Sequence, residues 1–115
     1  MANSKDQTFE GTKLKYLLEI EATGFDMETD DFNVTLKRGE KQLHFEKADL
    51  VVEPYTEIVN NVSIEKHHYY VCFDSAFFGP GGVKVVVKMY IPDDAFDDGY
   101  RTIVDAFNLV NVLGV

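Results

Sequence analysis

Alternating apolar and polar residues dominate the chain and predict β-strands. In residues 12–22, TKLKYLLEIEA, the side chains of Leu14, Tyr16 and Leu18 share one face, while lysines and glutamates occupy the other. A period of two is typical of a strand with one buried face. Similar alternation recurs in FNVTLKR (32–38), QLHFE (42–46), HHYYVCFD (67–74) and VKVVVKMYI (83–91).

Turn-forming residues separate these segments. Arg38-Gly39-Glu40-Lys41 predicts a tight turn, and FFGPGG (77–82) carries the strongest turn chemistry in the chain. TEIVNNVSIEK (56–66) predicts a long hairpin with its tip at Asn60-Asn61, because Asn tolerates left-handed backbone conformations. Pro54 lacks the N–H that a strand ladder needs, so LVVEPY predicts an edge strand or the end of a strand.

The last segment, RTIVDAFNLVNVLGV (101–115), loses its apolar phase across Asp105 and Asn108 and predicts a bulged strand. About seven strands, spaced roughly 10–15 residues apart without a helix, are typical of an antiparallel β-sandwich or barrel. We therefore predict an all-β, single-domain β-sandwich with an immunoglobulin-like Greek key over residues 1–115. Residues 1–11 are expected to be a flexible or edge N-terminal segment.

Composition narrows the choice of partners. The chain has 115 residues, which suits one core, and 11 Lys and Arg against 20 Asp and Glu give a net charge of −9. This charge repels phosphate backbones and anionic lipid headgroups, so neither nucleic acid nor a membrane surface is an expected partner. A protein partner, self-association or a carbohydrate fits better.

The single cysteine, Cys72, excludes an intramolecular disulfide, and we expect it to be a small, buried and inert group within a strand. No stretch reaches the ~18 apolar residues of a membrane span, and the start MANSKDQTFEGTK has no apolar signal-peptide core. The sequence as written predicts a cytoplasmic location. Whether an export or lipoprotein segment precedes residue 1 is left open.

An acidic segment, YIPDDAFDDGYRT (90–102), is the strongest candidate for a cation site. Oxygen ligands beside a flexible glycine suit Ca²⁺, whereas Phe96 stands where the helix-loop-helix calcium motif needs an acid. The preferred interpretation is a solvated turn whose aspartates cap backbone N–H groups. The candidate calcium ligands are Asp93, Asp94, Asp97 and Asp98.

A two-loop calcium site would also need the acidic residues of segment 26–31 at the same end of the fold. The number of strands formed by residues 42–55 decides whether the two acidic loops lie at the same end. If residues 42–55 form one bent strand, both acidic loops lie at the same end; if they form two strands, the loops lie at opposite ends.

Catalysis has little support in the sequence. His68, Cys72 and Asp74 share one face of a strand, but His68 and Cys72 are separated by about 13 Å at the rise of an extended chain, too far for activation. His67 and His68 point to opposite faces and cannot chelate one metal from a regular strand. We therefore predict a protein that is not an enzyme and needs no cofactor.

Aromatic residues are the other candidate binding groups. Tyrosine rings can stack on sugar faces, although Trp is absent, so a carbohydrate-binding module is an alternative. The tyrosines available for this are Tyr55, Tyr69, Tyr70, Tyr90 and Tyr100. The predicted centre of a protein interface is Phe77, Phe78, Tyr90 and Tyr100.

Three stretches of the chain resemble a family of small, uncharacterised proteins encoded in prophage tail and other mobile-element regions of gut anaerobic bacteria. They are ATGFDMETDDFNVTLKRG (22–39), YYVCFDSAFFGPGGV (69–83) and YIPDDAFDDGYRT (90–102). The resemblance implies a virion-associated or assembly component and carries over no functional residue. The leading hypothesis is a non-enzymatic structural or interaction module in a phage-tail-like or mobile-element assembly. A carbohydrate- or calcium-binding β-sandwich module is the alternative.

Overall fold

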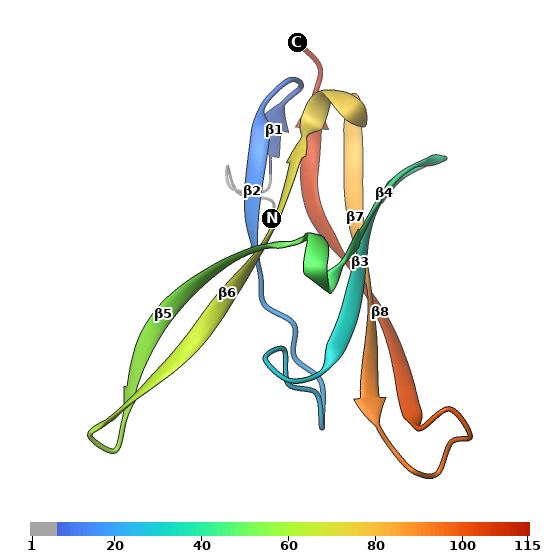
Figure 1. Ribbon diagram of the computed structural model, residues 1–115. Helices are drawn as coiled ribbons and strands as arrows, with labels where there is room; N and C mark the ends of the chain where they lie inside the picture. The colour runs from blue at the N-terminus through green and yellow to red at the C-terminus, as the bar shows by residue number, and fades with distance from the viewer. Residues whose placement is uncertain (1–6) are drawn as a thin grey trace.

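The computed structural model describes residues 7–115 and folds them into two β-sheets, with no α-helix in that range. The five-stranded sheet has the order β1-β8-β7-β3-β4 and the three-stranded sheet the order β2-β6-β5 (Figure 1). The strands are β1 (Gln7–Phe9), β2 (Lys13–Leu18), β3 (Asp31–Arg38), β4 (Lys41–Glu46), β5 (Val51–Val59), β6 (Val62–Asp74), β7 (Gly81–Pro92) and β8 (Tyr100–Leu113). Two 3₁₀ turns, η2 (Lys47–Asp49) and η3 (Ser75–Phe77), lie in the β4–β5 and β6–β7 connections. The all-β prediction is confirmed.

The N-terminal segment supplies an edge strand. β1 pairs in parallel with the end of β8, Gln7 opposite Asn111, whereas all other pairings are antiparallel. This confirms the edge alternative for residues 7–9, while residues 1–6 of the predicted N-terminal segment lie outside the described residues.

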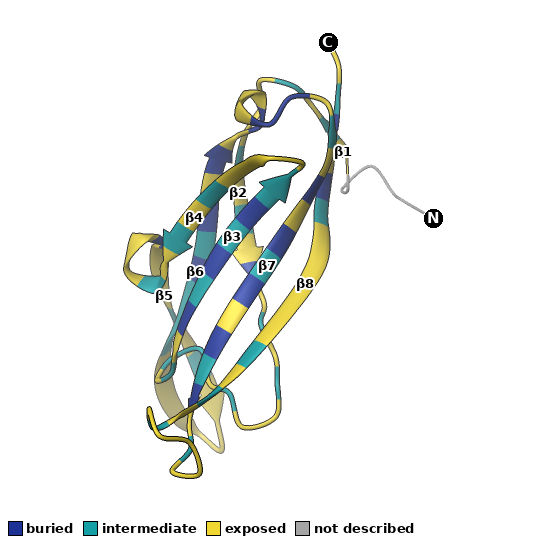
Figure 2. Cartoon of the chain, turned by 90° about the vertical axis from the view of Figure 1, so that its right-hand side faces the viewer, coloured by how far each residue is buried: buried dark blue, intermediate teal, exposed yellow. Residues whose placement is uncertain are grey.

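The core forms between the inner faces of the two sheets, as the alternation predicts. On β3, Phe32, Val34 and Leu36 are fully buried, and their neighbours on β7 show the same alternation of buried and exposed residues (Figure 2). The opposing sheet contributes Tyr69 and Val71 of β6. Fifteen buried residues form one cluster, so the two sheets share a single core.

The β6–β7 connection closes one end of this core. Ser75 of η3 is buried, and its backbone N–H and hydroxyl donate to the carbonyls of Thr12 and Phe9. Phe78 is also fully buried and packs edge-on against Phe73. Its predicted place in an exposed interface is therefore wrong, because this turn folds back over the core and carries the ring with it.

The β5–β6 hairpin has the predicted tip. Asn60 and Asn61 adopt φ angles of 52° and 63° between the paired residues Val59 and Val62. β5 continues through Pro54 as an edge strand, which confirms the edge alternative. Beyond the residues of β6 that pair with β2, the hairpin forms an arm that diverges from β7 and β8 (Figure 1). We call β5 and residues 62–68 of β6 the hairpin arm.

β8 carries the predicted bulge. Val110 pairs with Val83 but Asn108 pairs with Lys84, which leaves Leu109 without a direct cross-strand partner. The extra residue shifts the alternation, so Phe107 and Asp105 now lie on the inner side of the sheet, opposite buried Val85 and Val87. This shift explains the lost apolar phase.

The segment between β2 and β3 does not follow the predicted strand to residue 22. β2 ends at Leu18, and the chain then runs between the hairpin arm and the five-stranded sheet (Figure 1). Ile20, Phe25 and Met27 of this segment pack against the core. Where the two sheets diverge and no longer pack directly against each other, this segment packs against the core instead.

A matched pair of valines tests the assignment of the core. Val34→Ala removes buried methyl groups and is expected to lower the free energy of unfolding by about 2–3 kcal/mol. Val104→Ala, at a position that is 62% exposed, is expected to change it by less than about 0.5 kcal/mol. Urea unfolding followed by circular dichroism measures both values, and equal losses would contradict the burial of β3.

Candidate functional site

The aspartate segment after β7 forms a tight turn. The Asp93 carboxylate accepts the Ala95 N–H at 2.9 Å, and the Asp98 carboxylate accepts the Tyr100 N–H at 3.0 Å. The Asp93 N–H donates to the carbonyl of Gly99, whose φ is +84°. Two of the four predicted calcium ligands therefore cap backbone groups, as the turn interpretation expects.

The two acidic loops lie at the same end of the fold. β3 starts at Asp31 opposite Tyr90, so segment 26–30 lies beside the end of β7. The alternative of one bent strand over residues 42–55 is wrong, because β4 and β5 are two strands in different sheets, yet the loops still lie at the same end. β4 and β5 run in one direction and η2 carries the chain from one sheet to the other (Figure 1).

An arginine lies where these loops meet. The Arg101 guanidinium donates to the carbonyl of Thr23 at 3.2 Å, and its Nε lies 3.9 Å from the Asp93 carboxylate. Within residues 7–115, no three or more His, Cys, Asp or Glu side chains are grouped to hold a metal ion. Calcium binding by Asp93, Asp94, Asp97 and Asp98 stays a prediction of the sequence.

The residues predicted for an interface lie far apart. Phe77 is exposed at the β6–β7 turn, where its ring packs edge-on against Phe78. Tyr90 and Tyr100 pack edge-on against each other near the other end of β7. Tyr90 lies nine residues along β7 from its start at Gly81, so roughly 30 Å of strand separates the two pairs and they do not form one patch.

A different aromatic group lies on the outer face of the β2-β6-β5 sheet. The rings of Tyr55 and His68 stack with centroids 4.0 Å apart, and His68 meets Tyr70 edge-on at 6.2 Å. The ammonium group of Lys15 lies 4.5 Å from the centre of the Tyr70 ring. Three neighbouring rings and a cation thus form a continuous strip across the strands.

Two ion pairs flank this strip. Lys15 pairs with Glu53 at 2.5 Å and Lys66 pairs with Glu57 at 2.7 Å. The hydrogen bond to Glu53 raises the pKa of Lys15, and the same bond lowers the pKa of the Glu53 carboxyl. Since all four side chains are well exposed, these pairs contribute to the charge pattern of the face more than to stability.

Exposed apolar side chains are frequent on the strands of this sheet. Most lie on the face of the strip, whereas Val52 and Ile58 lie on the opposite face, as the partners of Tyr69 and Ser63. Seven of the fourteen large hydrophobic residues that are exposed belong to β2, β5 and β6. They are Leu17, Val51, Val52, Ile58, Val59, Val62 and Ile64. Ile58 is 72% exposed and Val62 58% exposed, both next to the hairpin tip. Exposed apolar patches are a common feature of surfaces that contact other proteins.

A polar anchor holds the base of the hairpin arm. The Glu28 carboxylate accepts the His67 backbone N–H at 2.6 Å and lies 2.9 Å from His67 Nδ1. The Lys47 ammonium donates to the backbone carbonyl of Asp30 at 2.8 Å and lies over the rings of Phe32 and Tyr69. Burial raises the pKa of Glu28, but the hydrogen bonds from His67 outweigh it and lower the pKa overall.

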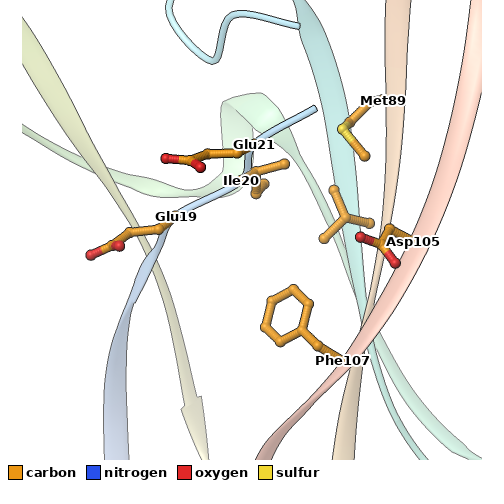
Figure 3. A pocket seen from close by; sticks show the side chains of 7 residues that line it. Glu19, Ile20, Glu21, Met89, Asp105 and Phe107 are labelled. Atoms are coloured by element: carbon orange, nitrogen blue, oxygen red, sulfur yellow. The ribbon is translucent and has the colours of Figure 1, made fainter. Parts of the chain in front are cut away.

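A cleft of about 300 Å³ lies between the β2–β3 segment and β8. Figure 3 shows Ile20 pointing toward Phe107 and Asp105, whereas the carboxylates of Glu19 and Glu21 extend away on the other side. Asp105 is the one carboxylate that faces this space, so the cleft does not gather charged groups for chemistry.

Cys72 is exposed, so its predicted burial is wrong. Its neighbours Val71 and Phe73 are buried, and the alternation of the strand therefore turns Cys72 outward. His67 and His68 lie on opposite faces as predicted, the first at Glu28 and the second against Tyr55.

Comparison with protein families, with curated proteins and with solved structures found no match to this chain. The resemblance to prophage-encoded proteins accordingly stays a prediction. Among the described residues, no helix has the length and apolar character that crossing a membrane requires.

The capping role of the aspartates predicts the response to calcium. Millimolar calcium should leave the melting temperature unchanged, because Asp93 and Asp98 already bind backbone N–H groups. Differential scanning fluorimetry with and without calcium checks this. A rise in the wild type that Asp97→Asn/Asp98→Asn removes would show that the loop is a calcium site.

The anchor predicts that Glu28 contributes to the free energy of unfolding in a pH-dependent way. Its folded-state pKa is lowered, so its contribution is present at neutral pH and is lost as the pH falls through that pKa. Glu28→Gln is expected to lower the free energy of unfolding by about 1–2 kcal/mol at pH 7, and the difference from wild type should shrink toward pH 3. Urea unfolding at several pH values measures this.

Glu40→Gln, in the exposed turn between β3 and β4, is the control for the anchor and should differ little from wild type at any pH. A constant difference between Glu28→Gln and wild type down to pH 3 would contradict the assigned charge interaction.

Proposed function

We propose that this protein is a non-enzymatic interaction module, built as an immunoglobulin-like β-sandwich, that acts through protein contacts in a phage-tail-like or other mobile-element assembly. The observation that carries the proposal is the apolar surface of the hairpin arm. The assembly context rests on the sequence resemblance. Four connections pass between the sheets, which supports a Greek-key arrangement; they are β1–β2, β2–β3, β4–β5 and β6–β7.

The hairpin arm exposes apolar residues that its own fold does not need. Ile58 and Ser63 face each other near the tip, as do Val59 and Val62, and neither pair lies over the five-stranded sheet (Figure 1). Leaving a large apolar side chain in water forgoes about 1.5–3 kcal/mol of transfer free energy. Burial against a partner would recover this free energy, which supports a role in protein contact.

The chemistry of the exposed side chains also favours contact over catalysis. His68, whose ring is occupied in stacking with Tyr55, lies four residues from Cys72 on the same strand, about 13 Å away. A base at that distance does not activate a thiol. Weak contacts of such a module gain strength when many copies act together in a symmetric assembly.

The proposal predicts that the tip residues are dispensable for folding. Ile58→Thr/Val62→Thr keeps β-branched side chains and should change the free energy of unfolding by less than about 0.5 kcal/mol. Binding of a hydrophobic fluorescent dye should fall in the same variant. Urea unfolding and dye titration measure the two effects.

Val34→Thr is the matched control, because it places a hydroxyl in the core and should be strongly destabilising. If the tip variant instead loses more than about 2 kcal/mol, its apolar residues serve the fold, and the proposal loses the observation that carries it.

A further inference from the structure

We infer that the outer face of the β2-β6-β5 sheet is the contact surface for a second copy of this chain. This inference rests on the proposed function, since it names the partner of an interaction module. The face is defined by the aromatic strip of Tyr55, His68 and Tyr70, together with the outward side chains around it: Lys13, Lys15, Leu17, Val51, Glu53, Glu57, Val59, Val62, Ile64, Lys66, Cys72 and Asp74.

The centre of this face is apolar and aromatic. Leu17 and Val51 are the direct cross-strand partners of Tyr70, one on each side, so these three residues form a row across all three strands. Tyr55 and His68 extend this apolar centre along the arm, toward its tip. Tyrosine-rich centres surrounded by charged residues are the usual composition of protein interfaces.

The charge pattern favours a second copy. The chain as a whole carries −9, which disfavours contact between most of its surfaces in two copies. The outer face of this sheet has three lysines and three acidic residues, so it is neutral and has both signs interspersed. These residues are Lys13, Lys15, Lys66, Glu53, Glu57 and Asp74. A twofold axis can place the lysines of one copy opposite the acids of the other.

The open edges of the sheet are less suitable for pairing. The His67 N–H points away from β5 to Glu28, so the opposite residue Pro54 directs its nitrogen to the free edge of β5. Proline interrupts strand addition there, and Glu28 covers the corresponding position on the edge of β6. Both edges of the arm are blocked near its base, whereas the outer face is open.

The size of the face predicts a weak dimer. β6 has thirteen residues and spans about 43 Å, and two paired strands with their side chains are about 10–14 Å wide. The face then offers roughly 500 Å² per copy, near the low end of specific interfaces. We expect a dissociation constant in the micromolar range.

The test is the solution mass by sedimentation and light scattering over a concentration series from low to high micromolar. The wild type should pass from monomer to dimer. Leu17→Glu places an unpaired charge at the centre of the face and should raise the dissociation constant by at least about tenfold. The matched control, Val104→Glu on the exposed outer side of the five-stranded sheet, should dimerise like wild type.

Cys72 provides a second readout that identifies the face. Its thiol is exposed on this surface in the single chain. Its rate of reaction with a thiol reagent should fall as wild-type concentration rises, and should stay constant in Leu17→Glu. An unchanged circular dichroism spectrum verifies that the Leu17→Glu variant is folded.

Two outcomes overturn the inference. A wild-type monomer at every concentration, with a constant Cys72 reaction rate, excludes the second copy as partner. Dissociation by Val104→Glu and not by Leu17→Glu would assign the dimer to the other sheet. Neither outcome bears on the proposed function, which depends on the stability of the Ile58→Thr/Val62→Thr variant.

Discussion

Side chains of β3 and β7 form a continuous apolar layer that packs against β6. This contact fixes how the two sheets are placed relative to each other. Phe32, Val34 and Leu36 of β3 are fully buried. β6 has thirteen residues, but its buried residues lie in Tyr69–Phe73, toward its end. The first half of β6 therefore extends past the shared core together with β5. The hairpin arm follows from the mismatch between a long strand and a short area of sheet-to-sheet contact.

The divergence of the arm creates a problem that polar groups solve. Where β6 leaves β2, its backbone N–H groups lose their strand partners, and a buried N–H without a partner is costly. Glu28 supplies the acceptor for His67, while Lys47 holds the carbonyls of the same loop. The β2–β3 segment is thus a structural part that fixes the arm, and its acidic residues have a role that does not require a metal ion.

Much of this fold could be predicted from the alternation of residue types. The strands, the Asn60-Asn61 tip, the edge position of Pro54 and the bulge in β8 all come from local backbone and packing rules. The relation between the two acidic loops could not be counted from strands, because β4 and β5 run in one direction across two sheets (Figure 1). Phe78 could not be placed either, since a turn has no period that distinguishes inside from outside.

The candidate surface was harder to predict for a physical reason. Alternation shows which residues share a face of a strand, but it does not show whether another layer covers that face. Tyr69 and Tyr70 are identical in type, yet one is buried in the core and the other lies on the open side of the sheet. Their difference is set by the layer formed by β3 and β7, which covers only the inner face. In the dimer that we propose, the aromatic row between balanced charges favours contact through the outer face. The edges interrupted by Pro54 and Glu28 disfavour strand addition.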